Sequence, residues 1–212
     1  LGRSPKDFDI GTDASPERIR KLFRNSRIIG RRFKINHVYF RGNKIIEVTT
    51  FRAPETLDED GQPQTRDNIY GDAESDALRR DLTINGLFYD LRTFSVIDYV
   101  GGMDDLENGL IRLIGDAHER VVADPVRMIR TIRHAAGTGF KIEENTYEAI
   151  SKNIELITTS SKARVYEEIV RDLKRGKAED SFKLLNETGL LEHLLPIFSE
   201  AIKVGAEEDF FS

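Results

Sequence analysis

Two aspartates near the start of the chain, Asp7 and Asp9, have the spacing that points most clearly to chemistry. They lie two positions apart in a predicted strand, so both side chains point to one face. Each carboxylate raises the free-energy cost of ionising the other unless a cation lies between them. Mg²⁺ prefers oxygen ligands, and two such ions can clamp the oxygens of a phosphoryl displacement. The alternative is an exposed strand edge with two solvated aspartates.

A third carboxylate, Glu47, lies in the run 45–51, which otherwise suits a buried strand. A carboxylate in such a strand needs a partner or a metal ion. A neighbouring strand could bring Glu47 toward Asp7 and Asp9. Alternatively, Glu47 faces solvent or pairs with a nearby arginine such as Arg31.

A second set of polar residues is Arg79, Arg80, Asp81 and Asn85. In a predicted helix, Asp81 and Asn85 are four positions apart and share a face. A carboxylate beside an amide suits ribose hydroxyls, whereas arginines suit phosphate oxygens. The alternative is an exposed helix face with ion pairs such as Asp76–Arg80.

A third set begins at Asp124, which precedes Pro125 at the predicted start of a helix. Asp at the N-cap and Pro at the first helical position are a typical helix start. Arg127, Arg130 and His134 follow on one stripe of that helix. An aspartate and an arginine three residues apart could bind a base edge, but the spacing alone favours capping by Asp124.

The charge is unevenly distributed along the 212 residues, whose formal net charge is −5. Ten basic residues and no acidic residue lie between Arg18 and Lys44, whereas segment 53–78 has eight acidic residues and only Arg66. Clustered basic side chains attract phosphates whatever the total charge, although a solvated basic face is the alternative. We predict that Arg31, Arg32 and Lys34 line a path for RNA or triphosphate.

The composition excludes several classes of protein. The absence of cysteine excludes a disulfide scaffold, thiolate-ligated zinc and a cysteine nucleophile. It also suits a reducing compartment, and we expect a cytoplasmic location. No apolar run approaches the roughly 18 residues needed to span a bilayer, and no signal peptide opens the chain.

Apolar periodicity predicts the elements that must position these residues. Predicted strands cover 6–12, 27–29, 33–40, 44–51, 94–100 and 111–114, with a hairpin turn at 41–43. Predicted helices cover 16–25, 75–91, 124–137, 143–156, 161–174 and 178–188. A long polar loop covers 52–74. The first half is therefore mixed α/β and the second all helical, with a boundary near Gly115.

In order and spacing, the motifs resemble those of the class II nucleotidyltransferases, the family of bacterial poly(A) polymerases and CCA-adding tRNA nucleotidyltransferases. Residues 1–12 resemble the L-G-x-x-P-x-D-x-D-x-x-T half of the catalytic motif, and 46–52 its next strand. Residues 79–85, 98–106 and 124–130 are similar to R-R-D-F-T-I-N, D-x-x-G-G-x-x-D-L and E-D-P-x-R-x-x-R. The resemblance covers essentially the whole chain.

The resemblance implies an α+β nucleotidyltransferase head with a mixed sheet and flanking helices, followed by an all-α neck and the start of an α-helical body. We expect the head over 1–115, the neck that recognises the nucleotide base over 116–176, and an RNA-binding body from 177 to 212. The chain begins inside the catalytic motif, so we expect the head to be truncated and this piece alone to be inactive.

The resemblance also implies a role for each site residue. Asp7 and Asp9 would bind two Mg²⁺ and activate an RNA 3′-hydroxyl against the α-phosphorus of a nucleoside triphosphate, with Glu47 as third carboxylate. Ribose and triphosphate would be held by Arg79, Arg80, Asp81 and Asn85. Asp124 and Arg127 would face the base, with Arg130 in support.

Within the family, residues 28–38 resemble the G-R-R-F-[RK]-x-x-H-V stretch of the poly(A) polymerase branch, and 66–71 also resemble that branch. The implied reaction is addition of AMP from ATP to RNA 3′ ends. The alternatives are CCA addition (or CC or A addition) to tRNA and a degenerate relative that only binds RNA. The chain departs from the family in having Ala123 where Glu is usual and Leu82 where Phe is usual.

Overall fold

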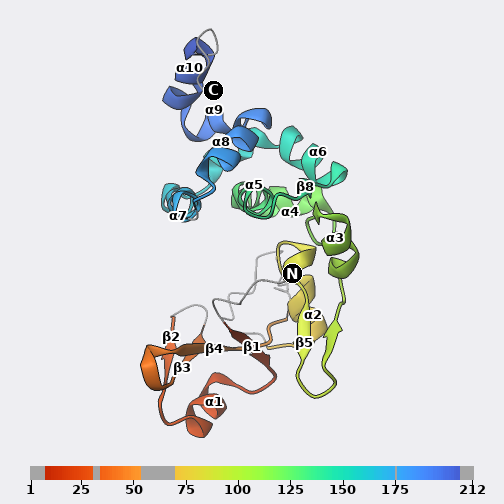
Figure 1. Ribbon diagram of the computed structural model, residues 1–212, viewed down its shortest axis with the longest axis vertical. Coiled ribbons are helices and arrows are strands. Elements are labelled where there is room, and N and C mark those ends of the chain that lie inside the picture. The colour runs from red at the N-terminus through yellow and green to blue at the C-terminus, as the bar shows by residue number, and fades with distance from the viewer. Residues whose placement is uncertain (1–7, 31–33, 54–69, 175, 206–212) are drawn as a thin grey trace, which may run out of the picture. The chain divides into compact units, whose positions relative to one another are not determined.

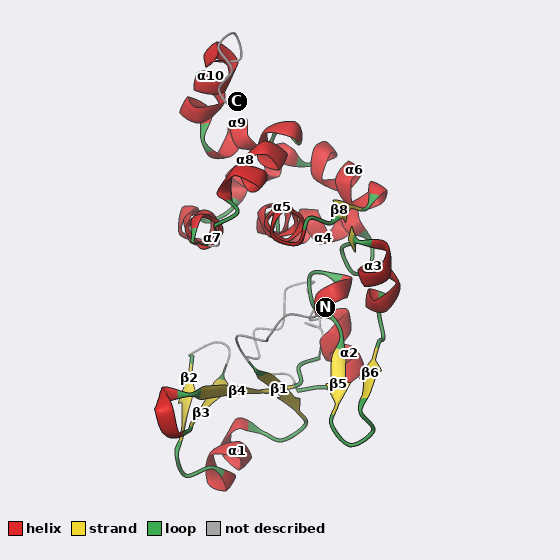
Figure 2. Ribbon diagram, in the orientation of Figure 1, coloured by secondary structure: helices red, strands yellow, loops and turns green. Residues whose placement is uncertain are grey.

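The computed structural model describes residues 8–30, 34–53, 70–174 and 176–205. Figures 1 and 2 show a part rich in strands and a part built mainly of helices. The packing divides the chain into two compact units, Leu1–Arg79 and Arg80–Ser212. Asp7, Arg31, Arg32 and most of the acidic loop, 54–69, lie outside the described residues.

The first unit contains a four-stranded mixed sheet. Its strands are β1 (Asp9–Thr12), β2 (Ser26–Ile29), β3 (Ile35–Tyr39) and β4 (Ile45–Thr50), in the order β1-β4-β3-β2. β1 runs parallel to β4, and the other pairs are antiparallel. The predicted turn at 41–43 joins β3 to β4, and Gly42 has φ +75°, the left-handed region that glycine enters without strain.

Two helices accompany this sheet. α1 (Pro16–Leu22) begins as predicted, because the Ser15 hydroxyl accepts a hydrogen bond from the Arg18 N–H at 3.3 Å and Pro16 takes the first position. Ile19 of α1 packs with Val38 and Val48 of the sheet in a small core. α2 (Ala73–Leu78) begins with a capping box between Asp72 and Ser75.

The predicted helix over 75–91 is wrong beyond Leu78. Leu82 is extended, with φ −118° and ψ 143°, and forms an antiparallel bridge with Leu113. A short 3-10 turn, η2 (Thr83–Asn85), and a hairpin of β5 (Phe88–Asp90) and β6 (Ser95–Ile97) follow. Burying Leu82 against Leu113, 31 residues away, therefore outweighs the local helical periodicity.

The second unit is mainly helical. The predicted helices correspond to α5 (Val126–Thr138), α6 (Glu144–Lys152), α7 (Lys162–Leu173) and α8 (Ala178–Glu187). The predicted helix over 143–156 ends at Lys152, and its last residues begin the 3-10 helix η3 (Ile154–Thr159). Further helices that the sequence pattern did not predict are α3 (Gly102–Asn108), α4 (Ala117–Ala123), α9 (Leu190–Leu194) and α10 (Pro196–Gly205). The expected strand near 111–114 is shorter and earlier, as β7 (Leu110–Ile111), and pairs in parallel with β8 (Lys141–Ile142).

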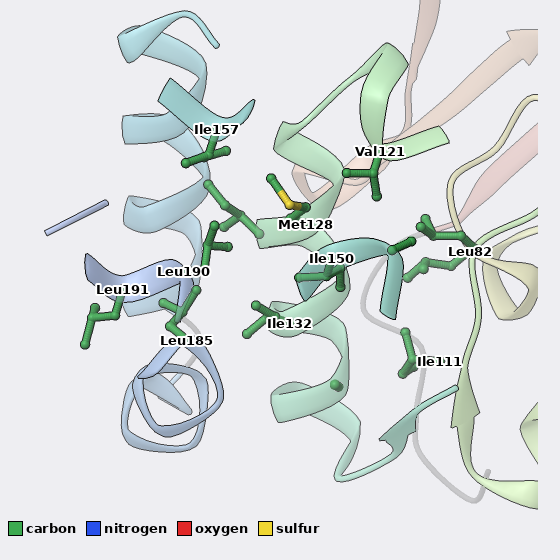
Figure 3. Close-up of a cluster of buried hydrophobic side chains, with 14 residues drawn as sticks. Leu82, Ile111, Val121, Met128, Ile132, Ile150, Ile157, Leu185, Leu190 and Leu191 are labelled. Carbon is green, nitrogen blue, oxygen red and sulfur yellow. The ribbon is translucent and has the colours of Figure 1, made fainter. Parts of the chain in front are cut away.

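The helical unit is held by a larger apolar core, which Figure 3 shows. Met128, Ile129 and Ile132 of α5 are at most 2% exposed and confirm the apolar periodicity that predicted this helix. Leu82, Ile111, Val121, Ile150, Leu185, Leu190 and Leu191 are also members of this fourteen-residue cluster. Each large side chain buried in this way contributes roughly 1.5–3 kcal/mol to stability. Because α5 supplies three of these large side chains, its burial stabilises the unit.

Candidate functional site

The first candidate site is a row of polar side chains across the sheet of the first unit. Asp9 on β1 pairs in register with Glu47 on β4, which pairs in register with His37 on β3. Residues in register on adjacent strands place their side chains on the same face, about 4.8 Å apart. The prediction that a neighbouring strand brings Glu47 toward Asp9 is therefore confirmed.

The two carboxylates of this row have few protein partners. The side chain of Glu47 is 45% exposed, and its Oε1 lies 3.3 Å from His37 Nε2. Asp9 is exposed, and no described residue forms a hydrogen bond or ion pair with its carboxylate. His37 is the histidine of the motif at 28–38, but its place beside Glu47 in this row was not predicted. The hairpin register about turn 41–43 was the signal that would have found it.

This donor set fits a hard divalent cation in kind, because two adjacent exposed carboxylates supply the oxygen ligands that Mg²⁺ prefers. The described residues alone include no group of three or more His, Asp or Glu side chains placed to hold a metal ion. Asp7, the other predicted ligand, lies outside the described residues. Two of the three predicted carboxylates, Asp9 and Glu47, are therefore brought together.

Of the residues predicted to bind RNA or phosphate, Lys34 is described. Its Nζ lies 3.2 Å from Glu17 Oε1 in an exposed ion pair. Such a surface pair is worth at most about 1 kcal/mol, so it leaves the lysine free to exchange partners. The corresponding prediction for Arg31 and Arg32 falls outside the described residues.

Arg79 and Arg80 have different surroundings. Arg79 donates from Nη2 and Nε to Oδ1 of the buried Asp76, at 2.6 and 2.9 Å. In the second unit, Arg80 donates from Nη1 to the Asn85 carbonyl at 2.9 Å, and its guanidinium carbon lies 5.0 Å from the centre of the Phe88 ring. The guanidinium of Arg80 is therefore held beside the backbone of Asn85, which is an exposed residue.

The second candidate site, in the helical unit, is centred on Asp81. Arg127 donates from Nε to Asp81 Oδ1 at 2.6 Å, and Arg130 donates from Nη1 to Oδ2 at 2.8 Å. Arg120 Nη2 lies 3.7 Å from the same carboxylate. Burial raises the pKa of Asp81, but the hydrogen bonds from Arg127 and Arg130 outweigh it, and the pKa lies below its ordinary value. Asp81 is thus ionised and fixed.

Asp124 lies at the junction of two helices, and the prediction that its side chain caps the second helix is wrong. It ends α4, and no side chain caps α5 at Pro125. Its Oδ2 instead accepts a hydrogen bond from Arg164 Nη2 at 2.7 Å, because a guanidinium is a stronger donor than a backbone N–H. Its Oδ1 is buried and has no hydrogen-bond partner in the described part of the chain.

The sequence predicted that Asp124, Arg127 and Arg130 work together, and the structure shows what holds each of them. Arg127 also donates from Nη1 to the Arg120 carbonyl at 2.8 Å, and Arg130 from Nε to Glu168 Oε1 at 3.0 Å. Glu168 was not predicted from the sequence to belong to this site. The available signal was that Arg164, Glu168 and Asp172 are four residues apart and so lie on one stripe of α7.

Comparison with known proteins identifies two matching family models. Residues 1–112 match a family described as "Poly A polymerase head domain". Residues 139–202 match one described as "Probable RNA and SrmB- binding site of polymerase A". The first model alone covers more than half of the chain.

The relatives come from both branches of the nucleotidyltransferases. The chain is 47% identical over 205 residues to Poly(A) polymerase I of Escherichia coli O157:H7, covering 92% of this chain and 44% of that protein. It is 36% identical over 194 residues to the CCA-adding enzyme of Bacillus pumilus, covering 92% and 48%. The chain therefore spans less than half the length of these curated relatives.

Solved structures show the same fold. The crystal structure of the Bacillus stearothermophilus CCA-adding enzyme in complex with CTP matches with a TM-score of 0.74 and 30% identity, covering 89% of this chain and 45% of that chain. A tRNA nucleotidyltransferase complexed with a primer tRNA and an incoming ATP analog matches with a TM-score of 0.75 at 24% identity, covering 92% and 55%. The predicted fold class, a mixed sheet with flanking helices followed by a helical part, is confirmed.

Proposed function

The chain belongs to the poly A polymerase head-domain family, and we propose that it carries the chemistry of an enzyme that adds AMP from ATP to RNA 3′ ends without a template. The observation that carries this proposal is the in-register placement of Asp9 beside Glu47 on a sheet face. The greater identity to Poly(A) polymerase I than to the CCA-adding enzymes, 47% against 36%, favours adenylate addition.

In this proposal Asp7 and Asp9 would hold two Mg²⁺, with Glu47 as the third carboxylate, and the ions would neutralise the triphosphate and favour the ionised RNA 3′-hydroxyl. Asp9 has no described cationic partner, so its charge remains available to ligands. His37 contacts Glu47 and so limits the orientations of that carboxylate. The role of the sheet is to hold the carboxylates side by side before substrate arrives.

The nucleotide is assigned to the arginines and acids at 79–85 and 124–130. Arg79 and Arg80 would bind phosphate oxygens, and Asp81 and Asn85 would bind ribose. Asp124 and Arg127 would read the base, with Arg130 in support. The buried acceptor Asp124 Oδ1, unpaired among the described residues, suits an exocyclic amine, which adenine carries at N6.

Arg31, Arg32 and Lys34 line an RNA or triphosphate path. The head covers 1–115, the neck 116–176, and an RNA-binding body begins at 177. The match at 1–112 supports the extent of the head, whereas the match at 139–202 covers parts of both the neck and the body. We place the protein in the cytoplasm, in keeping with its lack of cysteine. Within the described ranges, no helix is long and apolar enough to cross a membrane.

CCA addition to tRNA is the second candidate function. Cytosine carries an exocyclic amine at N4, so Asp124 Oδ1 suits it as well. The 30% identity to the CCA-adding enzyme that was solved with CTP favours this alternative.

The test is nucleotide incorporation by the full-length product of the gene that encodes this chain. The substrates are a labelled RNA oligonucleotide and a tRNA lacking its CCA end, each with Mg²⁺ and one or both of ATP and CTP. Long adenylate tails from ATP alone support adenylate addition. CTP-dependent addition that stops after three residues supports CCA addition instead. RNA binding without incorporation would indicate a degenerate relative and overturn both.

A further inference from the structure

A basic side chain lies at the far end of the row that carries Asp9 and Glu47. Arg27 on β2 pairs in register with His37 on β3, which pairs in register with Glu47 on β4. Adjacent strands lie about 4.8 Å apart, so Arg27 is about 14 Å from Asp9 along one face of the sheet. We propose that Arg27 and Tyr39 form a track on this face that binds the RNA strand just upstream of its 3′ end. The proposal names RNA contacts for the proposed function and rests on it.

Arg27 is available to bind an anion. It is exposed, and no described residue forms a hydrogen bond or ion pair with its guanidinium. Arg20, in contrast, donates from Nη1 to the backbone carbonyls of Phe23 and Arg24, at 3.4 and 2.7 Å. A planar guanidinium presents donors that match two phosphate oxygens at once. Arg27 therefore suits a phosphate of the RNA backbone, whereas Arg20 holds the end of α1.

Tyr39 adds an aromatic ring to the same face. It is partly exposed and lies two residues beyond His37 on β3, so both side chains point to the face that carries the carboxylates. Residues placed diagonally across an antiparallel pair are about 7–8 Å apart, and Tyr39 has this position relative to Arg27. A cation beside an aromatic ring is typical of surfaces that bind single-stranded RNA, because the cation binds a phosphate and a base stacks on the ring. One nucleotide can therefore contact both residues.

The sheet separates the basic residues of segment 18–44 into two groups. Val38 and Val48 alternate with the residues of the row and point to the opposite face, where Ile19 of α1 packs against them (Figure 1). The helix α1 therefore lies on the side of the sheet away from the carboxylates. Its basic residues are Arg18, Arg20 and Lys21. Arg27 belongs instead to the carboxylate face, so it is the basic residue of the two groups that a substrate on that face can reach.

The direction of the row favours the RNA strand over the triphosphate as the ligand of Arg27. The RNA 3′-hydroxyl is assigned to the carboxylate end of the row, and the triphosphate is assigned to Arg79 and Arg80. A phosphate at Arg27 is separated from the reacting group by the strands that carry His37 and Glu47, which suits a nucleotide upstream of the 3′ end. Such a contact holds the strand without taking part in the reaction. Its loss should therefore raise KM for RNA and leave kcat nearly unchanged.

The test uses the full-length gene product with Arg27→Gln and Tyr39→Ala. The matched control is Arg18→Gln, which removes the same charge from α1, on the opposite side of the sheet. The affinity for a single-stranded RNA oligonucleotide is measured without ATP at a series of salt concentrations. KM for RNA and KM for ATP are then measured in incorporation assays.

Each variant has its own expected signature. Arg27→Gln should weaken RNA binding about tenfold and reduce the slope of log affinity against log salt by about 0.7, because one phosphate contact is lost. Tyr39→Ala should weaken binding about tenfold with an unchanged slope, because stacking neutralises no phosphate. Arg27→Lys should keep the slope, and Tyr39→Phe should keep the affinity. KM for RNA should rise with the loss of binding, whereas KM for ATP should stay unchanged, and the Arg18→Gln control should change neither.

The outcomes separate the track from the function on which it rests. If the unmodified protein binds RNA but incorporates no nucleotide, the proposed function fails, whereas the RNA affinities still test the track. If Arg27→Gln keeps the affinity and slope of the unmodified protein, or changes them no more than Arg18→Gln does, the track is overturned. A rise in KM for ATP alone would place Arg27 at the triphosphate and would also overturn it. If Tyr39→Ala does not fold, Arg27→Gln decides, because Arg27 is exposed.

Discussion

The carboxylates of the two units differ in how many cationic side chains surround them. On the sheet, Asp9 has no cationic partner among the described residues, and Glu47 contacts only the side chain of His37 there. In the helical unit, Asp81 and Glu168 each lie within 4 Å of three arginines. An uncompensated acid is available to a ligand, whereas a compensated acid acts by holding its partners.

The hydrophobic cores of the two units also differ, in size. The buried cluster of the first unit consists of Ile19, Val38 and Val48, whereas fourteen buried residues form the cluster of the second. Hydrophobic stabilisation increases with the apolar area removed from water, so the helical unit gains more stability from its core. The unit with the solvent-exposed carboxylates thus has the smaller described core.

The largest expected effect is on activity. Asp9→Asn should lower nucleotide incorporation by on the order of 10³-fold, about 4 kcal/mol in activation free energy, because it removes a ligand charge that nothing described replaces. Asp13→Asn is the matched control, because Asp13 is exposed just beyond β1. Incorporation assays on the full-length gene product measure both. Activity retained in Asp9→Asn would show that the sheet carboxylates are not the reactive ones.

The next effect compares the two cores. Ile132→Ala should destabilise the helical unit by about 3–5 kcal/mol, and Ile19→Ala the first unit by about 2 kcal/mol, since a smaller cluster surrounds Ile19. Hydrogen exchange read separately over residues 8–53 and 80–205 measures each loss. Equal losses, or a larger one for Ile19→Ala, would remove the contrast between the cores.

Asp81→Asn should cost about 2 kcal/mol at pH 7, because it leaves Arg127 and Arg130 without their charged acceptor. The folded pKa of Asp81 is depressed, so this contribution is present above its unfolded pKa and is lost as pH falls through the folded pKa. Urea unfolding at a series of pH values should therefore show the difference from the unmodified protein shrinking below about pH 4. The control Glu107→Gln changes an exposed acid on α3, and a pH-independent difference would contradict the ion-pair explanation.

The smallest effect belongs to Glu47→Gln. Its side chain is 45% exposed beside His37, so the free energy of unfolding should change by less than about 0.5 kcal/mol. Urea midpoints for this variant and for His37→Gln test that expectation. A loss above about 1 kcal/mol in either variant would mean that Glu47 stabilises the fold, as Asp81 does, and that the carboxylates of the two units do not differ in this way.

Features that depend on local spacing could be predicted from the sequence. Ser15 and Pro16 start α1 because the cap is made within three residues. The approach of Glu47 to Asp9 follows from alternation along two strands that belong to one sheet. The apolar stripe of α5 follows from its helical period. In each case, the information lies within one element or one pairing.

Features that depend on distant partners could not be predicted. Leu82 is not helical because it pairs with Leu113. Asp124 does not cap a helix because its carboxylate binds Arg164, which lies 40 residues further along the chain. The burial of Glu168 depends on arginines of another helix, so its spacing alone does not distinguish it from an exposed acid. Competition between local and long-range partners is decided by energies that only the folded arrangement reveals.

The short parallel pair of β7 and β8 has a kinetic consequence. Parallel strands require a crossover, and here the chain between Ile111 and Lys141 contains α4 and α5. Closing a loop of about 30 flexible residues for so few hydrogen bonds is entropically unfavourable, whereas preformed helices shorten the search. We therefore expect β7 and β8 to pair late in folding. Disrupting this pairing should then mainly accelerate unfolding and have little effect on the folding rate.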